Sequence, residues 1–177
     1  MKPETTNIPG VLIITPKVYT DDRGFFLESY NRMNFKAAGI DEEFVQDNHS
    51  KSTRGVVRGL HYQKKYPQGK LIRAIQGEVL DVVVDIRKAS PTFGKWVSIL
   101  ISEENNKQVW IPGGLAHGFS VLSETAEFCY KVTDYYHPED EAGIRWNDPQ
   151  LNIDWQVESP ILSEKDKKLP MLSEIDL

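Results

Sequence analysis

The sequence contains one cysteine, Cys129, and four histidines among its 177 residues. A single cysteine excludes an internal disulfide and a zinc site built on several thiolates. No apolar run approaches the roughly 20 residues that a membrane-spanning helix needs, and the first residues lack the apolar core of a signal peptide. We therefore expect a cytoplasmic protein with no membrane partner.

Positive charge is also in the minority. The chain has 21 Lys and Arg against 26 Asp and Glu, a formal net charge of −5. This balance argues against nucleic acid as a partner, because binding to phosphate backbones favours a basic surface. Hydrophobic residues make up 40% and charged residues 27%, which is typical of a globular protein. At roughly 100–200 residues per domain, the length predicts one domain, residues 1–177.

Short segments rich in Val, Ile and aromatic residues follow one another from residue 71 onward, separated by turn-forming residues. Strands are expected at 71–76, 78–86, 95–101, 107–112, 118–122 and 126–136. Many short strands with few helices between them predict an antiparallel sandwich or barrel and exclude a parallel α/β sheet.

The segment 78–86 alternates clearly. Asp81 and Asp85 fall on one face, and the other face consists of Leu80, Val82, Val84 and Ile86. This pattern is typical of a half-buried strand.

Two short helices are expected outside the strands. The stretch NRMNFKAA carries good helix formers after polar residues, and Gly39 is placed to end it. A second short helix near the C-terminus is expected to be capped by Ser163 and to stop before Pro170.

His117 closes the pattern PGGLAH (residues 112–117), which resembles the second motif of the cupin jelly roll. Metal-binding cupins also carry two closely spaced histidines and a carboxylate in their first motif. Here the corresponding RGLHYQ supplies only His61. With so few imidazole and carboxylate ligands, no metal is expected.

Cationic side chains gather between residues 54 and 73, and such a cluster suits an anion such as a diphosphate. Arg58 and Lys70 are the stronger candidates, because apolar residues flank them. Lys64 and Lys65 fit equally well as solvated lysines that protect a strand edge. The other members are Arg54, His61 and Arg73.

Three further residues have two interpretations each. Tyr130 fits a core aromatic as well as a proton donor in a cationic pocket. Asp166 fits the third helical position of a capping box that begins at Ser163. A lone histidine such as His61 is most often a satisfied interior side chain, and the pattern alone leaves these alternatives open.

Longer motifs in order along the chain resemble one family, the dTDP-4-dehydrorhamnose 3,5-epimerases. They are DDRGFFLESYN (21–31), QDNHS (46–50), GVVRGLHYQ (55–63), GKLIRAIQGEVLDVVVDIR (69–87), SPTFGKW (90–96), IPGGLAHGFSVLSE (111–124), AEFCYKVTDYYHPEDEAGIRWNDP (126–149) and LSEKD (162–166). The combination of RGLHYQ with KVTDYYHPEDEAGIRWNDP is highly specific, and the resemblance covers nearly the whole chain.

The resemblance implies an all-β fold: a cupin-type jelly-roll β-barrel with a few short peripheral helices. It implies a homodimer that uses no metal and no organic cofactor. His61 matches the family's base, Tyr130 its acid, Asp166 the carboxylate paired with the base, and Lys70 the lysine beside the keto oxygen. The nucleotide-sugar site is expected to include Arg23, Phe26, Glu28, Gln46, Asn48, Arg58, His117, Tyr135, Glu141 and Lys165, with Phe25 or Tyr136 as alternatives for the aromatic contacts.

These residue types suit the implied reaction, epimerisation of dTDP-4-dehydro-6-deoxy-D-glucose at C3 and C5. The 4-keto group acidifies both neighbouring C–H bonds, so the site needs a base, an acid and a positive charge at the developing oxyanion. An imidazole, with an ordinary pKa of about 6.5, can act as a base near neutral pH, and a lysine can stabilise the oxyanion. Two other functions remain open: epimerisation at C3 or C5 alone, and a non-catalytic cupin that binds a nucleotide sugar.

One spacing conflicts with a regular strand. Arg58 and His61 are three positions apart and would point to opposite faces. We therefore predict an irregularity at Gly59, which would let both side chains serve one pocket.

Overall fold

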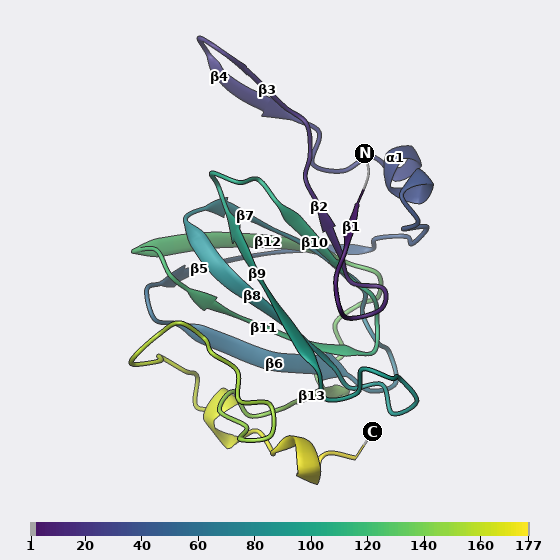
Figure 1. Cartoon of the computed structure of the whole chain (residues 1–177), viewed down its shortest axis with the longest axis vertical. Helices are drawn as coiled ribbons and strands as arrows, with labels where there is room; N and C mark the ends of the chain where they lie inside the picture. The colour runs from purple at the N-terminus through teal and green to yellow at the C-terminus, as the bar shows by residue number, and fades with distance from the viewer. Residues whose placement is uncertain (1–2, 177) are drawn as a thin grey trace.

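Alternating apolar residues build two antiparallel sheets that face each other in the computed structural model, which describes residues 3–176 (Figure 1). The six-stranded sheet has the order β1 (Glu4–Thr5), β2 (Leu12–Ile14), β10 (Gln108–Ile111), β7 (Lys70–Gln76), β12 (Thr125–Val132) and β5 (Gln46–Thr53). The five-stranded sheet has the order β13 (Glu141–Gly143), β6 (Val57–Gln63), β11 (Leu115–Val121), β8 (Glu78–Asp85) and β9 (Trp96–Ser102). The expected jelly roll is confirmed, with two separate sheets in place of one continuous barrel. The six expected strands form as β7 to β12, although the strand expected at 126–136 ends at Val132.

The principal core lies between the two sheets. Ile72 and Phe128 enter it from the six-stranded sheet, and Val83 and Phe119 enter it from the five-stranded sheet. Burial of such side chains contributes roughly 1.5–3 kcal/mol each. This packing holds the strands that carry the polar residues described below.

Strand β8 differs from its expected half-buried state. Every residue from Val79 to Asp85 is buried, and both Asp81 and Asp85 are 0% exposed. The reason is that the face carrying Leu80 packs under the C-terminal residues, including Trp155. The opposite face, which carries Asp81, points toward the space between the sheets.

The helix expected after Ser29 is confirmed as α1 (Arg32–Ala37). The Asn31 side chain caps it by accepting hydrogen bonds from the backbone N–H groups of Met33 and Asn34. The C-terminal helix is shorter than expected, since two 3₁₀ turns form instead, η1 (Asp166–Lys168) and η2 (Leu172–Glu174). Ser163 is not the N-cap of the first turn, but its Oγ accepts a 3.0 Å hydrogen bond from the backbone N–H of Asp166, where that turn begins.

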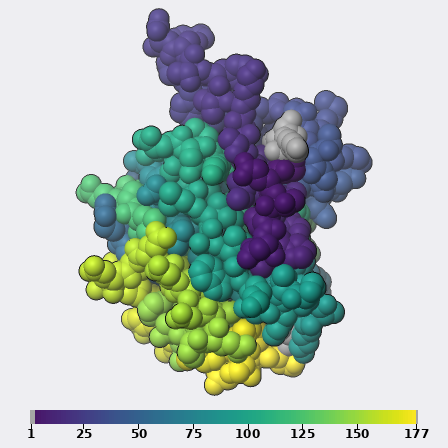
Figure 2. Space-filling model, viewed as in Figure 1, coloured from purple at the N-terminus to yellow at the C-terminus, as the bar shows by residue number. Residues whose placement is uncertain are grey.

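A separate hairpin, β3 (Val18–Asp21) and β4 (Gly24–Leu27), projects away from both sheets (Figures 1 and 2). Its aromatic side chains are exposed, with Phe25 at 65% and Phe26 at 68%. Because successive side chains of a strand point to opposite faces, the hairpin exposes one phenylalanine on each face, and the chain itself leaves both largely uncovered.

Candidate functional site

A cavity of about 490 Å³ opens between the sheets and the C-terminal segment. Eight of the residues predicted from the sequence line it, although they come from β6, β7, β11, β12, β13 and the C-terminal segment. They are Arg58, His61, Lys70, His117, Tyr130, Glu141, Lys165 and Asp166.

The predicted irregularity at Gly59 is confirmed. Arg58 is the partner of Phe119 and His61 the partner of His117, so β6 takes three steps where β11 takes two. Gly59 has φ of +105°, and a Cβ there would lie 2.6 Å from the carbonyl oxygen of His117. This bulge turns Arg58 and His61 toward the same cavity.

His61 and Asp166 form a close polar contact at the cavity wall, with Nε2 of the imidazole 2.6 Å from Oδ1 of the carboxylate. Burial acts to raise the pKa of Asp166, but the hydrogen bond and charge of His61 and the Ser163 hydroxyl outweigh it and lower this pKa. Asp166 is therefore ionised near neutral pH. Because Nε2 is bound to the carboxylate, Nδ1 is the nitrogen left to accept a proton.

Tyr130 lines the same cavity from β12 and packs its ring 6.0 Å from that of Phe128. Burial raises the pKa of its phenol, although the nearby charge of Arg58 acts to lower it. The phenol thus keeps its proton near neutral pH and has it available to donate.

Lys70 is buried at the start of β7, at 9% exposure. Burial lowers its pKa to about 8, while the carboxylates of Asp81 and Glu141 act in the opposite direction. The side chain is therefore largely an ammonium group at neutral pH and can face a developing negative charge.

Asp81 is a functional candidate that the sequence analysis missed. Its Oδ1 lies 2.6 Å from Nε2 of His117, and its Oδ2 is buried without a hydrogen-bond partner among the described residues. Burial lowers the pKa of His117, although Asp81 acts to raise it. His117 is thus neutral, with Nδ1 as its acceptor. An aspartate between Leu80 and Val82, in an otherwise apolar run, was the only indication in the sequence.

At the rim of the cavity, the Glu141 carboxylate accepts hydrogen bonds from the Tyr136 hydroxyl and the Lys165 ammonium. Tyr136 lines the cavity, whereas Tyr135 does not and is 60% exposed. Strand β12 ends at Val132, so the strand alternation could not decide which tyrosine faces inward.

Five other predicted residues lie outside the cavity lining. Arg23, Phe26 and Glu28 belong to the projecting hairpin or follow it, and the Arg23 guanidinium is bound to the Asp21 carboxylate. Gln46 and Asn48 lie on β5, where Gln46 Oε1 accepts a 3.3 Å hydrogen bond from Tyr136 N and Asn48 lines a second hollow.

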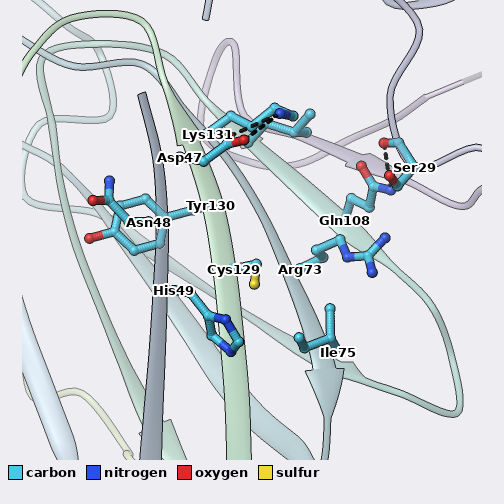
Figure 3. Close-up of a pocket in the computed structure, with 11 residues that line it drawn as sticks. Ser29, Asp47, Asn48, His49, Arg73, Ile75, Gln108, Cys129, Tyr130 and Lys131 are labelled. Atoms are coloured by element: carbon cyan, nitrogen blue, oxygen red, sulfur yellow. Dashed lines mark hydrogen bonds and ion pairs between the residues drawn. The ribbon is translucent and has the colours of Figure 1, made fainter. Parts of the chain in front are cut away.

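The other face of the six-stranded sheet carries a second hollow of about 330 Å³ (Figure 3). Its lining includes His49, Arg73, Cys129 and Lys131. In the same view Asn48 and Tyr130, which are cross-strand partners, lie side by side.

Within residues 3–176, no group of three or more His, Cys, Asp and Glu side chains could hold a metal ion. The same part of the chain has no helix with the length and apolar character required to cross a membrane.

Comparison with known proteins agrees with this geometry. The sequence profile of the family described as dTDP-4-dehydrorhamnose 3,5-epimerase matches residues 5–174. A Shigella flexneri protein of that name is 60% identical, covering 91% of this chain and 90% of its own. A Pseudomonas aeruginosa protein of the same name is 56% identical, covering 99% of this chain and 98% of its own.

Two solved structures are similar as well. A Legionella pneumophila dTDP-6-deoxy-D-glucose-3,5-epimerase, in complex with dTDP-4-keto-L-rhamnose, has a TM-score of 0.96 and 53% identity, covering 99% of this chain and 94% of its own. A 3′-monoepimerase from Streptomyces bikiniensis, in complex with dTDP-quinovose, has a TM-score of 0.91 and 33% identity, covering 98% and 88%. The chain belongs to the dTDP-4-dehydrorhamnose 3,5-epimerase family.

Proposed function

We propose that this protein epimerises dTDP-4-dehydro-6-deoxy-D-glucose at C3 and C5 to dTDP-4-dehydro-L-rhamnose, a step in the synthesis of dTDP-L-rhamnose. The observation that carries the proposal is one cavity lined by a carboxylate-bound imidazole, a protonated phenol and a buried ammonium group. We treat residues 1–177 as a single cytoplasmic epimerase domain that needs no cofactor.

In the proposed mechanism, Nδ1 of His61 takes the proton from C5 or C3, and the electron pair of the C–H bond moves to the 4-keto oxygen. Lys70 stabilises the resulting enolate, and Asp166 stabilises the imidazolium. Tyr130 then returns a proton to the carbon from the opposite face, which inverts the centre. The phenolate regains a proton from solvent and His61 loses its proton to solvent, so protons and electrons balance.

Binding of the nucleotide portion is assigned to the rim. Arg58 points into the cavity, and its Nε and Nη2 lie 3.2 and 3.0 Å from the Ser52 hydroxyl. A guanidinium held in this way is suited to a diphosphate. Tyr136 is the aromatic residue of its pair that is placed to contact the rest of the nucleotide.

We also propose that the active unit is a homodimer. Arg23 and Phe26 match residues that contact substrate in the family, yet in this chain their hairpin lies away from the cavity. A second copy of the chain could receive this hairpin at its own cavity and cover the exposed phenylalanines. The hollow on the outer sheet face offers a further surface for such a partner (Figure 3).

The test is NMR of the purified protein with authentic 4-keto sugar in deuterated water. We expect deuterium at both C3 and C5 and formation of the L-sugar. Deuterium at one carbon alone would identify a mono-epimerase, and binding of the dTDP-sugar without exchange would identify a binding protein. His61→Asn should abolish exchange at both carbons while leaving dTDP binding nearly intact, and Tyr130→Phe should block or redirect reprotonation.

A further inference from the structure

Gln63, the last residue of β6, has a buried side chain at 6% exposure, and its amide group is fully used. Its Oε1 accepts a 2.7 Å hydrogen bond from the backbone N–H of His137. Its Nε2 donates to the carbonyl oxygens of Tyr66, at 2.7 Å, and Tyr135, at 3.2 Å. One side chain therefore joins the loop after β6 to the loop after β12.

The groups that Gln63 binds on the second loop are the two peptide units that flank Tyr136. The carbonyl of Tyr135 precedes Tyr136, and the N–H of His137 follows it. The loop from residue 133 to 140 forms no strand or helix, so no regular backbone ladder holds this position. The third hydrogen bond to these two peptide units is the 3.3 Å bond from Tyr136 N to Gln46 Oε1.

The same loop is supported beside Tyr136 as well. The His137 ring stacks on Tyr66 with centroids 4.4 Å apart, and the Asp140 carboxylate accepts from the backbone N–H groups of Lys65 and Tyr66. These contacts join the two loops but do not reach the peptide units that flank Tyr136, which are held by Gln63 and Gln46. Gln63 is thus the direct link between β6, which carries His61, and the orientation of Tyr136.

The Tyr136 side chain then reaches Glu141, which is the cross-strand partner of Gln63. Glu141 also binds Lys165, the residue before Asp166. We propose that Gln63 is a positioning residue, which fixes Tyr136 in the wall of the cavity and thereby sets the affinity for the nucleotide portion of the substrate. This proposal rests on the function proposed above for the same cavity.

The test is a double-mutant cycle with dTDP as the ligand, measured by calorimetry. Gln63→Ala should weaken dTDP binding about tenfold, because the free energy of one to two hydrogen bonds that hold Tyr136 in place corresponds to a change of this size. Tyr136→Ala should weaken it by at least as much. If Gln63 acts through Tyr136, adding Gln63→Ala to Tyr136→Ala should change the dissociation constant by less than about twofold.

Steady-state kinetics gives a second readout. Gln63 lines the cavity, but its hydrogen bonds go to the backbone of Tyr66, Tyr135 and His137 and not to the proton-transfer groups. Gln63→Ala should therefore raise KM about as much as it raises the dTDP dissociation constant, with kcat changed by less than about threefold. If Gln63→Ala lowered kcat about tenfold and left KM unchanged, the proposal would be overturned. It would also be overturned if the losses of dTDP affinity in the two single variants multiplied in the double variant, or if Gln63→Ala bound dTDP as tightly as the wild type.

Asn105 provides a matched control. Its amide also makes three hydrogen bonds to backbone, with the N–H groups of Ser102 and Lys107 and the carbonyl of Leu100, but it lies outside the cavity lining. Asn105→Ala should reduce stability comparably to Gln63→Ala and leave dTDP binding within about twofold. An equal loss of binding in the control would show that general destabilisation explains the effect and would overturn the proposal.

If Gln63→Ala does not fold, Gln63→Glu keeps the volume and the acceptor while losing the donor to Tyr66 and Tyr135. It should also weaken dTDP binding, and wild-type affinity in this variant would overturn the proposal. The binding cycle needs no turnover. A wild-type protein that binds dTDP without exchanging protons would therefore refute the epimerase function while leaving the role of Gln63 testable.

Discussion

The Asp166 carboxylate binds Nε2 of His61 at 2.6 Å, although 105 positions separate the two residues. The carboxylate does not make the side-chain contact of a capping box, but its backbone N–H still donates to Ser163 Oγ at 3.0 Å. This hydrogen bond fixes the backbone of Asp166, and the side chain is free to bind the imidazole. The turn therefore has a structural and a chemical role at once.

Asp166→Asn is expected to lower the rate of deuterium incorporation by on the order of 10²–10⁴-fold, because the neutral amide neither fixes the His61 tautomer nor stabilises the imidazolium. Proton exchange followed by NMR measures the effect. Glu164→Gln is the control, since Glu164 is an exposed neighbour whose carboxylate binds only Lys167 among the described residues. Wild-type exchange in Asp166→Asn would exclude this pairing from the mechanism.

Activity and stability should respond in opposite directions to the titration of Lys70. The rate should fall as the pH rises through about 8, because the ammonium group that stabilises the enolate is lost. The pH profile of kcat/KM, which reports the ionisations of the free enzyme, measures this. Lys70→Met should lower kcat by about 10²–10³-fold and abolish this alkaline limb. An unchanged limb in the variant would assign the titration to another group.

The stability prediction for Lys70 follows from the same burial. Its pKa is about 8 in the folded protein against an ordinary 10.5, so between these pH values the unfolded chain binds more protons. The Lys70 contribution to the free energy of unfolding must therefore rise with pH across this window, and the burial penalty is fully present below it. Urea unfolding of wild type and Lys70→Met should show that the free energy of unfolding of the wild type rises relative to that of the variant from pH 8 to 10.

Gly59→Ala is expected to destabilise the fold by more than about 3 kcal/mol, because a positive φ and a clash act together. The new Cβ would lie 2.6 Å from His117 O and 2.7 Å from the Gly118 Cα. Gly39→Ala separates the two effects, since Gly39 has φ of +91° and a Cβ added there would meet nothing within 4 Å. The free energy of unfolding of Gly39→Ala, measured with urea, should fall by only about 1–2 kcal/mol. An equal fall in Gly59→Ala would show that the surrounding structure relieves the clash.

The homodimer proposal predicts complementation between two inactive variants. His61→Asn lacks the base, and Arg23→Ala lacks the hairpin guanidinium. If the hairpin of one copy completes the cavity of the other, each mixed dimer has one intact site. After random exchange of equal amounts, about a quarter of all sites should be active. Mixtures that remain as inactive as the separate variants would show that the hairpin does not serve a partner's site.

Local features of the chain were predictable because short-range physics decides them. Short runs of Val, Ile and aromatic residues between turn formers located β7 to β12, a polar residue before good helix formers located α1, and the spacing of Arg58 and His61 predicted the bulge at Gly59. Each of these depends on neighbours within a few residues, whose backbone preferences are visible in the sequence.

The burial of each strand face and the orientation of the loops were harder to predict from the sequence. The aspartates of β8 look exposed by alternation, yet both are buried because the C-terminal segment covers one face and the opposite sheet covers the other. Tyr136 is oriented into the cavity by contacts from distant segments: Gln63 and Gln46 bind the peptide units on either side of it, and Glu141 accepts from its hydroxyl.

The sequence by itself determined strands β7 to β12, the family and the inventory of reactive side chains, because these depend on residue types and their near neighbours. The pairing of Asp166 with His61 was expected from the family resemblance, and the structure confirms it. Only the tertiary structure decided that Asp81 meets His117, that Tyr136 lines the cavity in place of Tyr135, and that the hairpin with Arg23 leaves its own cavity. Such contacts join distant segments, and their geometry depends on how whole sheets and loops pack. No local preference of the chain encodes that packing.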